Sequence, residues 1–170
     1  MKTIITTVAI FVLGLTSNFA QTLNSTSSVD YFGKINTVYS NSYGATVATS
    51  TTSRDYFGYD NTTYYAANGS NIGSSTSNTD YFGNTVTTSY DSSGYSVGTS
   101  IGSTDYFNNY NVDYYNSNGV STGQSTTSTD YFGYDNTNYT NSSGQSIGTT
   151  TGSYDYFGNY NTTTTVDPWN

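Results

Sequence analysis

The sequence predicts an all-β protein made of tandem two-strand repeats. A DYFG motif or its variant recurs every 25 residues without insertion or deletion, and a fixed period of this size is typical of repeat architectures. After residue 20 the chain has one Leu, one Pro and no Glu, Met or Cys, whereas Thr, Tyr, Val and Ile, which favour strands, are abundant. The 20 Tyr and 8 Phe argue against a disordered chain, because disordered segments are poor in aromatic residues.

The first 20 residues are expected to be a secretory signal peptide. Lys2 precedes an apolar run from Ile4 to Leu15, and small and polar residues follow as far as Ala20. The run is shorter than the roughly 20 residues that span a bilayer, so we expect no stable membrane span and a secreted, extracellular or cell-surface protein. Residues 21–29 would then be an N-terminal lead-in, and residues 30–170 a domain of six DYFG repeats, the last of them truncated.

Two turns are predicted in each repeat, because two short segments begin with Asp or Asn and end with Gly, as type I turns prefer. The second of these segments begins with Asn or Asp in four of its five copies. In the fourth DYFG motif Asn108 replaces Gly, and Asn is well tolerated at positive φ. The DYFG turns begin at Asp30, Asp55, Asp80, Asp105, Asp130 and Asp155, and the second turns end at Gly44, Gly69, Gly94, Gly119 and Gly144.

The segments between the turns have the lengths of single strands. One has seven residues, as in 134–140, and the other has ten, as in 145–154, so the chain should form roughly ten to twelve strands. The first segment carries a column of Tyr residues, and the second carries columns of Gly and Ser that indicate close backbone approach.

The Phe residues are expected to form a stacked, buried core column. Every Phe after residue 20 lies in the DYFG motif, one in each repeat, which suggests that neighbouring units cover it. These residues are Phe32, Phe57, Phe82, Phe107, Phe132 and Phe157.

Two architectures fit this pattern. We expect a β-solenoid or β-arch stack, because columns of Asn, Ser, Thr and Tyr can form favourable ladders. A solenoid would place the six Asp residues at the ~4.8 Å strand spacing, however, whereas an antiparallel meander of hairpins, the alternative, would double their separation.

The composition is unsuited to most catalytic chemistry and to nucleic-acid binding. There is no His, Cys or Glu, so we expect neither an enzyme nor a cofactor or metal site, and the absence of His leaves no catalytic triad. A net charge of −8 with three scattered cations opposes phosphate binding. The repeated Asp could be calcium ligands, but one Asp per 25 residues fits a turn initiator better.

One segment resembles the repeats of choline- and glucan-binding cell-wall proteins. Residues 113–123, DYYNSNGVSTG, are similar to the YY-N-x-x-G-x-x-x-T-G core of those tandem hairpins, over about half of a 25-residue unit. This resemblance implies binding to a surface polysaccharide.

The whole chain resembles, in its architecture, the subunits of curli-type fibres. It combines a signal peptide with acidic tandem units that are rich in Gly, Asn, Ser and Thr and lack Cys. The resemblance implies self-association through exposed strand edges, which are templates for other chains. We therefore expect a secreted, self-assembling subunit of an extracellular fibre or biofilm matrix. The alternatives are a surface adhesin or polysaccharide-binding repeat module, and a disordered chain that orders with a partner.

Overall fold

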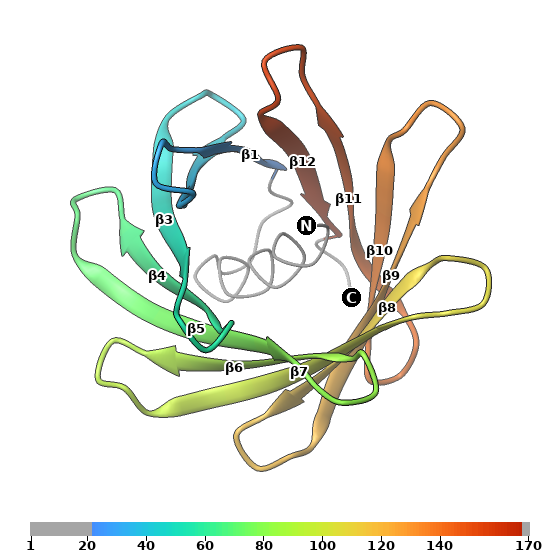
Figure 1. The fold of residues 1–170 in the computed structure, drawn as a ribbon. Helices are drawn as coiled ribbons and strands as arrows, with labels where there is room; N and C mark the ends of the chain where they lie inside the picture. Colours follow the sequence, from blue (N-terminus) through green and yellow to red (C-terminus); the bar gives the residue numbers. More distant parts are fainter. Residues whose placement is uncertain (1–21, 168–170) are drawn as a thin grey trace.

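The computed structural model describes residues 22–167, which form twelve antiparallel strands closed into a barrel (Figure 1). Each strand pairs with its neighbours in the chain, and the first strand also pairs with the last. The strands are β1 (Thr22–Val29), β2 (Ile35–Asn41), β3 (Thr46–Arg54), β4 (Asp60–Ala66), β5 (Asn71–Thr79), β6 (Thr85–Asp91), β7 (Ser96–Thr104), β8 (Tyr110–Asn116), β9 (Ser121–Thr129), β10 (Asp135–Asn141), β11 (Ser146–Tyr154) and β12 (Tyr160–Val166).

The all-β class and the two-strand repeat are confirmed, but the expected solenoid stack is wrong. The connections are those of the alternative, an antiparallel meander of hairpins, which here closes on itself. Equivalent residues of successive repeats therefore lie on every second strand, about 9.5 Å apart rather than about 4.8 Å. This spacing reduces the repulsion between the repeated Asp side chains.

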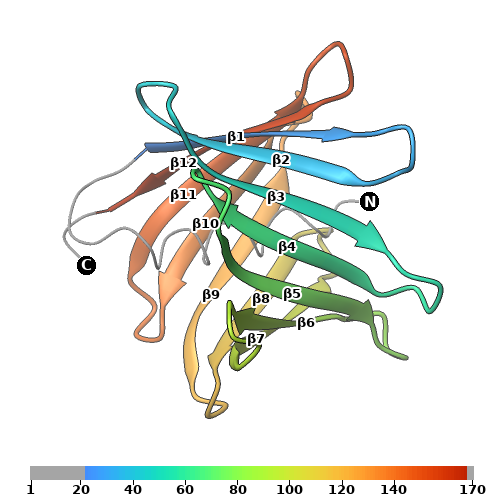
Figure 2. The ribbon, with the colours of Figure 1, turned by 90° about the vertical axis from the view of Figure 1, so that its left-hand side faces the viewer.

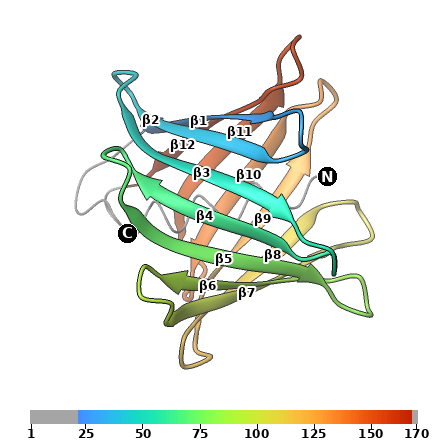
Figure 3. The same cartoon turned by 60° about the vertical axis from the view of Figure 1, so that its left-hand side comes forward.

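The two kinds of predicted turn occupy opposite ends of the barrel (Figures 2 and 3). The DYFG turns connect odd-numbered strands to the even-numbered strands that follow, and the second turns connect even to odd. Asn108 has a φ of 64°, which explains why Asn can replace Gly in that motif. The predicted Gly residues of the second turns also have positive φ, between 76° and 85°, at Gly44, Gly69, Gly94, Gly119 and Gly144.

The barrel is closed by the two ends of the described chain. Residues 22–29, expected to be a lead-in, form β1 and pair with β12 from Thr22↔Thr165 to Ser27↔Tyr160. The truncated sixth repeat has only one strand, and β1 takes the place of its missing second strand. Every strand of residues 22–167 thus has two neighbours, so the expectation of exposed strand edges is wrong.

A β-bulge follows each of the five second turns. In the β2–β3 hairpin the register shifts between Tyr39 and Ser40, which pair with Ala48 and Thr46, so Val47 is the extra residue. The same shift recurs in the β4–β5, β6–β7, β8–β9 and β10–β11 hairpins. Because a bulge increases the local twist and bends the strand, five of them promote the curvature that closes the sheet.

The interior is built from Tyr, Ser and Thr side chains. Tyr39, Tyr64, Tyr114 and Tyr139 are only 2–6% exposed, and the hydroxyl groups of the first three lie 2.9–3.3 Å from serine hydroxyls of the following strand. Ser and Thr hydroxyls also pair directly across strands, as between Ser25 and Thr162 at 2.7 Å. No buried side-chain nitrogen or oxygen of residues 22–167 lacks a hydrogen-bond partner. Hydrogen bonds between hydroxyl groups therefore hold much of this interior together, as apolar packing does in other barrels.

The predicted Gly and Ser columns lie on the inner wall. A Cβ at Gly98, Gly123 or Gly148 would meet a backbone carbonyl oxygen of the next strand, as expected for close backbone approach. The Ser column supplies the buried residues that contact the Tyr hydroxyls, as Ser50 does for Tyr39.

The outer wall carries polar pairs, with Thr-to-Asn bonds such as that from Thr76 to Asn61 at 3.0 Å, beside exposed apolar residues such as Val38 and Ile101. Residues 22–167 contain no helix that is long and apolar enough to cross a membrane. The expected signal peptide, residues 1–20, lies outside the described residues.

Candidate functional site

Twelve aromatic side chains are displayed at one end of the barrel. Each DYFG turn presents a Tyr that is 96–97% exposed and a Phe that is 80–84% exposed. Within each pair the ring centroids are 5.5–5.6 Å apart and the planes are nearly perpendicular. We call this set the aromatic crown; it consists of Tyr31–Phe32, Tyr56–Phe57, Tyr81–Phe82, Tyr106–Phe107, Tyr131–Phe132 and Tyr156–Phe157.

The expectation that the six Phe residues form a buried column is therefore wrong. The Phe occupies the third position of a tight turn, beyond the end of the sheet, where no neighbouring unit covers it. The buried aromatic column consists of Tyr residues in the strands instead.

The turns that carry the crown are held by their Asp residues. One carboxylate oxygen of Asp30 accepts hydrogen bonds from the backbone N–H groups of Phe32 and Lys34, both at 2.9 Å. The Gly33 N–H donates to the Asp30 carbonyl, and Gly33 has a φ of 78°, which together make a type I turn with a G1 bulge. The other five motifs repeat both carboxylate bonds. The prediction that Asp initiates the turn is confirmed.

Such hydrogen bonds stabilise the ionised form of a carboxylate, and they lower the pKa of Asp30, Asp80 and Asp105. The backbone N–H of Lys34 makes the largest contribution to the lowered pKa of Asp30, and that of Asn109 does the same for Asp105. At Asp80 the side chain of Asn84 has the largest effect, with its backbone N–H next. The crown is thus a ring of aromatic pairs on turns with ionised carboxylates, and its rim is acidic.

Residues 22–167 contain no cluster of three or more His, Cys, Asp or Glu side chains that could hold a metal ion. The carboxylate oxygens of the turns instead face donors of the same turn and of the strand that follows, such as the Asn36 side chain of β2 at 3.4 Å from Asp30.

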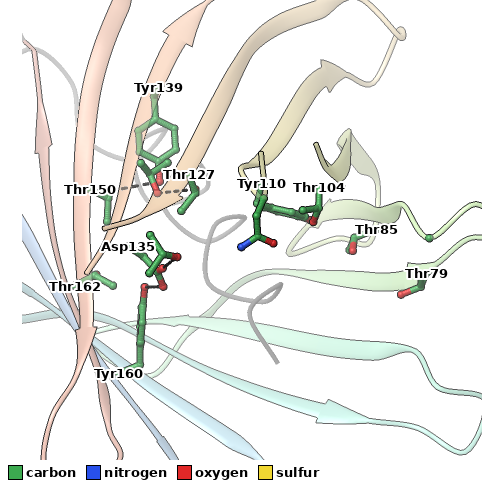
Figure 4. Close-up of a pocket in the computed structure, with 14 residues that line it drawn as sticks. Thr79, Thr85, Thr104, Tyr110, Thr127, Asp135, Tyr139, Thr150, Tyr160 and Thr162 are labelled. Atoms are coloured by element: carbon green, nitrogen blue, oxygen red, sulfur yellow. Dashed lines mark hydrogen bonds between the residues drawn. The ribbon is translucent and has the colours of Figure 1, made fainter. Parts of the chain in front are cut away.

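A second candidate site is a cavity of about 240 Å³ inside the barrel (Figure 4). It lies at the crown end, because Gly83 and Asn108 of two DYFG turns contribute to its lining. Most of the remaining lining consists of Thr side chains, with Tyr110, Tyr139 and Tyr160 and a single carboxylate, Asp135.

Asp135 is anchored by two hydroxyl groups. The Thr129 hydroxyl donates to one carboxylate oxygen at 2.6 Å, and the Tyr160 hydroxyl donates to the other at 2.9 Å. Burial, the hydrogen bond to Asp135 and the negative charge of that carboxylate all raise the pKa of Tyr160, so it remains a neutral donor. Figure 4 shows the Tyr160 ring reaching toward Asp135 from below the cavity.

Two glycines make room for the tyrosines of this cavity. Gly152 on β11 separates Tyr160 on β12 from Asp135 on β10, and a Cβ at Gly152 would overlap the Tyr160 ring, with 2.7 Å to its Cζ atom. Gly102 has the same relation to Tyr110, because a Cβ at Gly102 would overlap the Tyr110 ring. In both cases the Tyr lies eight residues after the Gly, and the other repeats have Thr or Ser in place of this Gly.

The sequence singled out the Asp and Phe residues of the DYFG motifs but assigned Phe to the wrong environment, and neither the Tyr residues of the crown nor the cavity was predicted as a site. A signal for the cavity was present, because the position that holds Asp135 differs from repeat to repeat. The six residues at this position are Ile35, Asp60, Thr85, Tyr110, Asp135 and Tyr160.

No protein-family model matches this chain, and no curated protein matches it either. The resemblances to curli-type subunits and to cell-wall repeats therefore stay predictions, and the geometry of the crown and cavity carries the functional argument.

Proposed function

We propose that this protein is an extracellular adhesion module that binds a neutral polysaccharide through the aromatic crown, without catalysis. The observation that carries the proposal is the nearly complete exposure of six identical Tyr–Phe pairs on one end of the barrel. Large apolar side chains gathered on a surface are typical of interaction sites, whereas isolated ones are common on any protein.

The crown makes little contribution to the fold that displays it. The barrel is held by strand pairing and by the buried Tyr, Ser and Thr hydroxyls, and each exposed Phe has its ring contact with the Tyr beside it in the same turn. The carboxylate-anchored turns hold each pair in a defined position. Such pre-organisation lowers the ordering cost of binding.

The chemistry of the crown favours a neutral glycan. The faces of aromatic rings can stack on the C–H faces of pyranose rings, and the six turn carboxylates disfavour acidic polymers. One pair alone would bind weakly, on the order of millimolar, or about −4 kcal/mol. A repetitive polymer can engage several pairs at once, and the raised effective concentration then increases the avidity by roughly 10²–10⁴.

The test is binding of residues 21–170 to insoluble neutral polysaccharides such as cellulose, chitin and β-1,3-glucan, with sedimentation of the bound fraction. Variants replace Tyr and Phe by Ser in two, four or all six DYFG motifs. The matched control is Tyr43→Ser with Tyr95→Ser, because these residues are 93% and 74% exposed at the opposite end. We expect the bound fraction to fall steeply as two, four and six motifs are changed, and to stay unchanged in the control. Equal binding by the sixfold variant, or no binding to any polysaccharide, would contradict the proposal.

Self-assembly into an extracellular fibre is the second candidate, favoured by the same surface. Since β1 and β12 close the barrel, residues 22–167 offer no free strand edge to another copy, whereas the exposed aromatic side chains of the crown could contact a second copy end to end. Sedimentation velocity and negative-stain electron microscopy distinguish the two functions. Filaments of the parent protein that disappear in the sixfold variant would support assembly, whereas a persistent monomer that binds glycan would support adhesion.

A further inference from the structure

The repeat places two carboxylates at equivalent positions on opposite sides of the barrel. Asp60 begins β4 and Asp135 begins β10, three repeats and six strands apart. Each pairs across the sheet with the last residue of the preceding strand, which is Arg54 for Asp60 and Thr129 for Asp135. The two sites therefore differ in the group that faces the carboxylate.

At the first position the chain itself supplies a cation. Arg54 donates from Nε to one oxygen of Asp60 at 2.8 Å and from an Nη nitrogen to the other at 2.7 Å, a bidentate pair. The geometry of this turn end therefore suits a guanidinium group in front of the carboxylate.

At the second position the carboxylate has only neutral donors among the partners that the structure describes. Asp135 accepts from the hydroxyls of Thr129 and Tyr160. The cationic side chains of residues 22–167 are Lys34, in the turn between β1 and β2, and Arg54, which is bound to Asp60. Asp135 therefore combines a carboxylate on the cavity wall with the lack of a described side chain that would pair with its charge, as Arg54 does for Asp60.

The space for such a ligand lies beside Asp135. The cavity of about 240 Å³ is below the usual range for drug-sized ligands, and it is lined by the rings of Tyr110, Tyr139 and Tyr160 together with Thr hydroxyls. Aromatic faces attract organic cations, and hydroxyls accept their remaining N–H groups. We infer that this cavity binds a small organic cation whose guanidinium or ammonium group pairs with Asp135, in the manner of Arg54 with Asp60.

This inference is independent of the crown function, because Asp135 and the cavity tyrosines lie inside the barrel and the crown pairs lie outside it. The probes are n-butylguanidinium and n-butylammonium, with 1-butanol as the neutral control of similar size. Binding to residues 21–170 is measured by ligand-observed NMR and isothermal titration calorimetry. Both cations should bind, and 1-butanol should not.

Two variants and a control test the role of the carboxylate. Asp135→Asn keeps the shape and should weaken binding of the cations by about tenfold or more, as expected for loss of a charged hydrogen bond. Thr129→Arg places the equivalent of Arg54 opposite Asp135 and should abolish binding while the barrel stays folded. Asp113→Asn is the matched control, because Asp113 faces outward and accepts from Gln124 at 2.7 Å; its binding should equal that of the parent.

The inference would be overturned by equal binding of 1-butanol, by unchanged affinity in Thr129→Arg, or by a parent protein that binds neither cation at millimolar concentration. Circular dichroism of each variant verifies the fold. If Asp135→Asn does not fold, the Thr129→Arg variant alone decides, since it keeps Asp135 and adds an ion pair to it.

Discussion

Because Tyr160 packs directly over Gly152, the effect of a substitution at either position on the free energy of unfolding should depend on the residue at the other. The Tyr160 side chain is 8% exposed, lies over Gly152 and donates to Asp135 at 2.9 Å. Changing Gly152 to Ala places a methyl group where the Tyr160 hydroxyl and Cζ now lie, the latter only 2.7 Å from the added carbon. The tyrosine must then move, because the opposing atoms cannot both occupy that space.

The size of the effect follows from what Tyr160 loses. A small shift that keeps the ring inside resembles overpacking and costs about 1–3 kcal/mol. Complete expulsion removes roughly 150 Å² of apolar burial, which at ~25 cal/mol per Å² is about 4 kcal/mol as an upper bound. Loss of the bond to the carboxylate adds about 1.5–3 kcal/mol. We therefore expect Gly152→Ala to lower the free energy of unfolding by about 2–4 kcal/mol, a partial displacement.

A second substitution should remove this penalty. Tyr160→Thr introduces the residue found at the equivalent position Thr85, where the preceding repeat has Ser77 in place of the glycine. With the ring gone, Gly152→Ala should be neutral or stabilising by roughly 0.5–1 kcal/mol, because Ala loses less conformational freedom than Gly in a strand. Gly152 does not have positive φ, so its backbone accepts Ala.

The assay is urea unfolding of the four proteins of this double-mutant cycle, followed by circular dichroism, with equal m-values as the condition for comparison. A coupling free energy of about 1.5 kcal/mol or more between the two sites would support the packing of Tyr160 over Gly152. Additive effects, or a Gly152→Ala variant as stable as the parent, would refute the proposed packing of Tyr160 over Gly152.

Three further predictions concern closure and pH. Ser25→Cys with Thr162→Cys should form a disulfide within one chain, because opposed strand residues have suitable Cα separations and the chain has no other Cys. Mass spectrometry should detect this bond, and it should find none in the control variant Ser25→Cys with Thr137→Cys. Disulfides between chains in the first variant would contradict closure. Hydrogen bonds lower the pKa of turn residues such as Asp105, so their contribution to stability is present above pH 3.8 and is lost as the pH falls through the lower folded-state pKa. Acid unfolding measured by circular dichroism should therefore begin below pH 3.8. Loss of the folded signal well above that pH would contradict this prediction. Burial raises the pKa of core residues such as Tyr39 above 10.0, so their stabilisation is lost as pH rises from 10 through the folded-state pKa; tyrosinate absorbance of these groups should appear together with unfolding, not before it.

The parts of the fold that depend on local chemistry could be predicted from the sequence. Asp at the start of each DYFG motif and Gly at its end specify a turn through bonds within five residues, such as those of Asp30 to Phe32 and Lys34. Two turns per 25 residues then determine the strand number, but they fit both a solenoid and a hairpin meander, and the expected solenoid was wrong. The Tyr and Ser residues of these columns contact each other in the interior, because one strand register places both on the inner face of the barrel.

Closure and burial could not be predicted, because they depend on the sum of small geometric effects. The pairing of Ser25 with Thr162 joins residues 137 positions apart, and the twist added by five bulges promotes it. The match between the two ends was visible, since Ser25 continues the 25-residue column of Ser50 and Ser75. The regular spacing of Phe showed that each copy has the same environment, but it could not show whether that environment is buried or exposed.

The repeat also explains why the crown and the cavity should act independently. The DYFG turns are almost identical in all six repeats, so the crown offers six equivalent contacts and suits a partner that is itself repetitive. The inner position that holds Asp135 differs between repeats, and only there do a carboxylate without a described cation, a tyrosine donor and a glycine gap meet. The repeated outer surface fits the proposed multivalent binding of a polymer, and the Asp135 cavity fits the proposed binding of one small cation. Removal of the crown should therefore leave cation binding unchanged, and Asp135→Asn should leave adhesion unchanged.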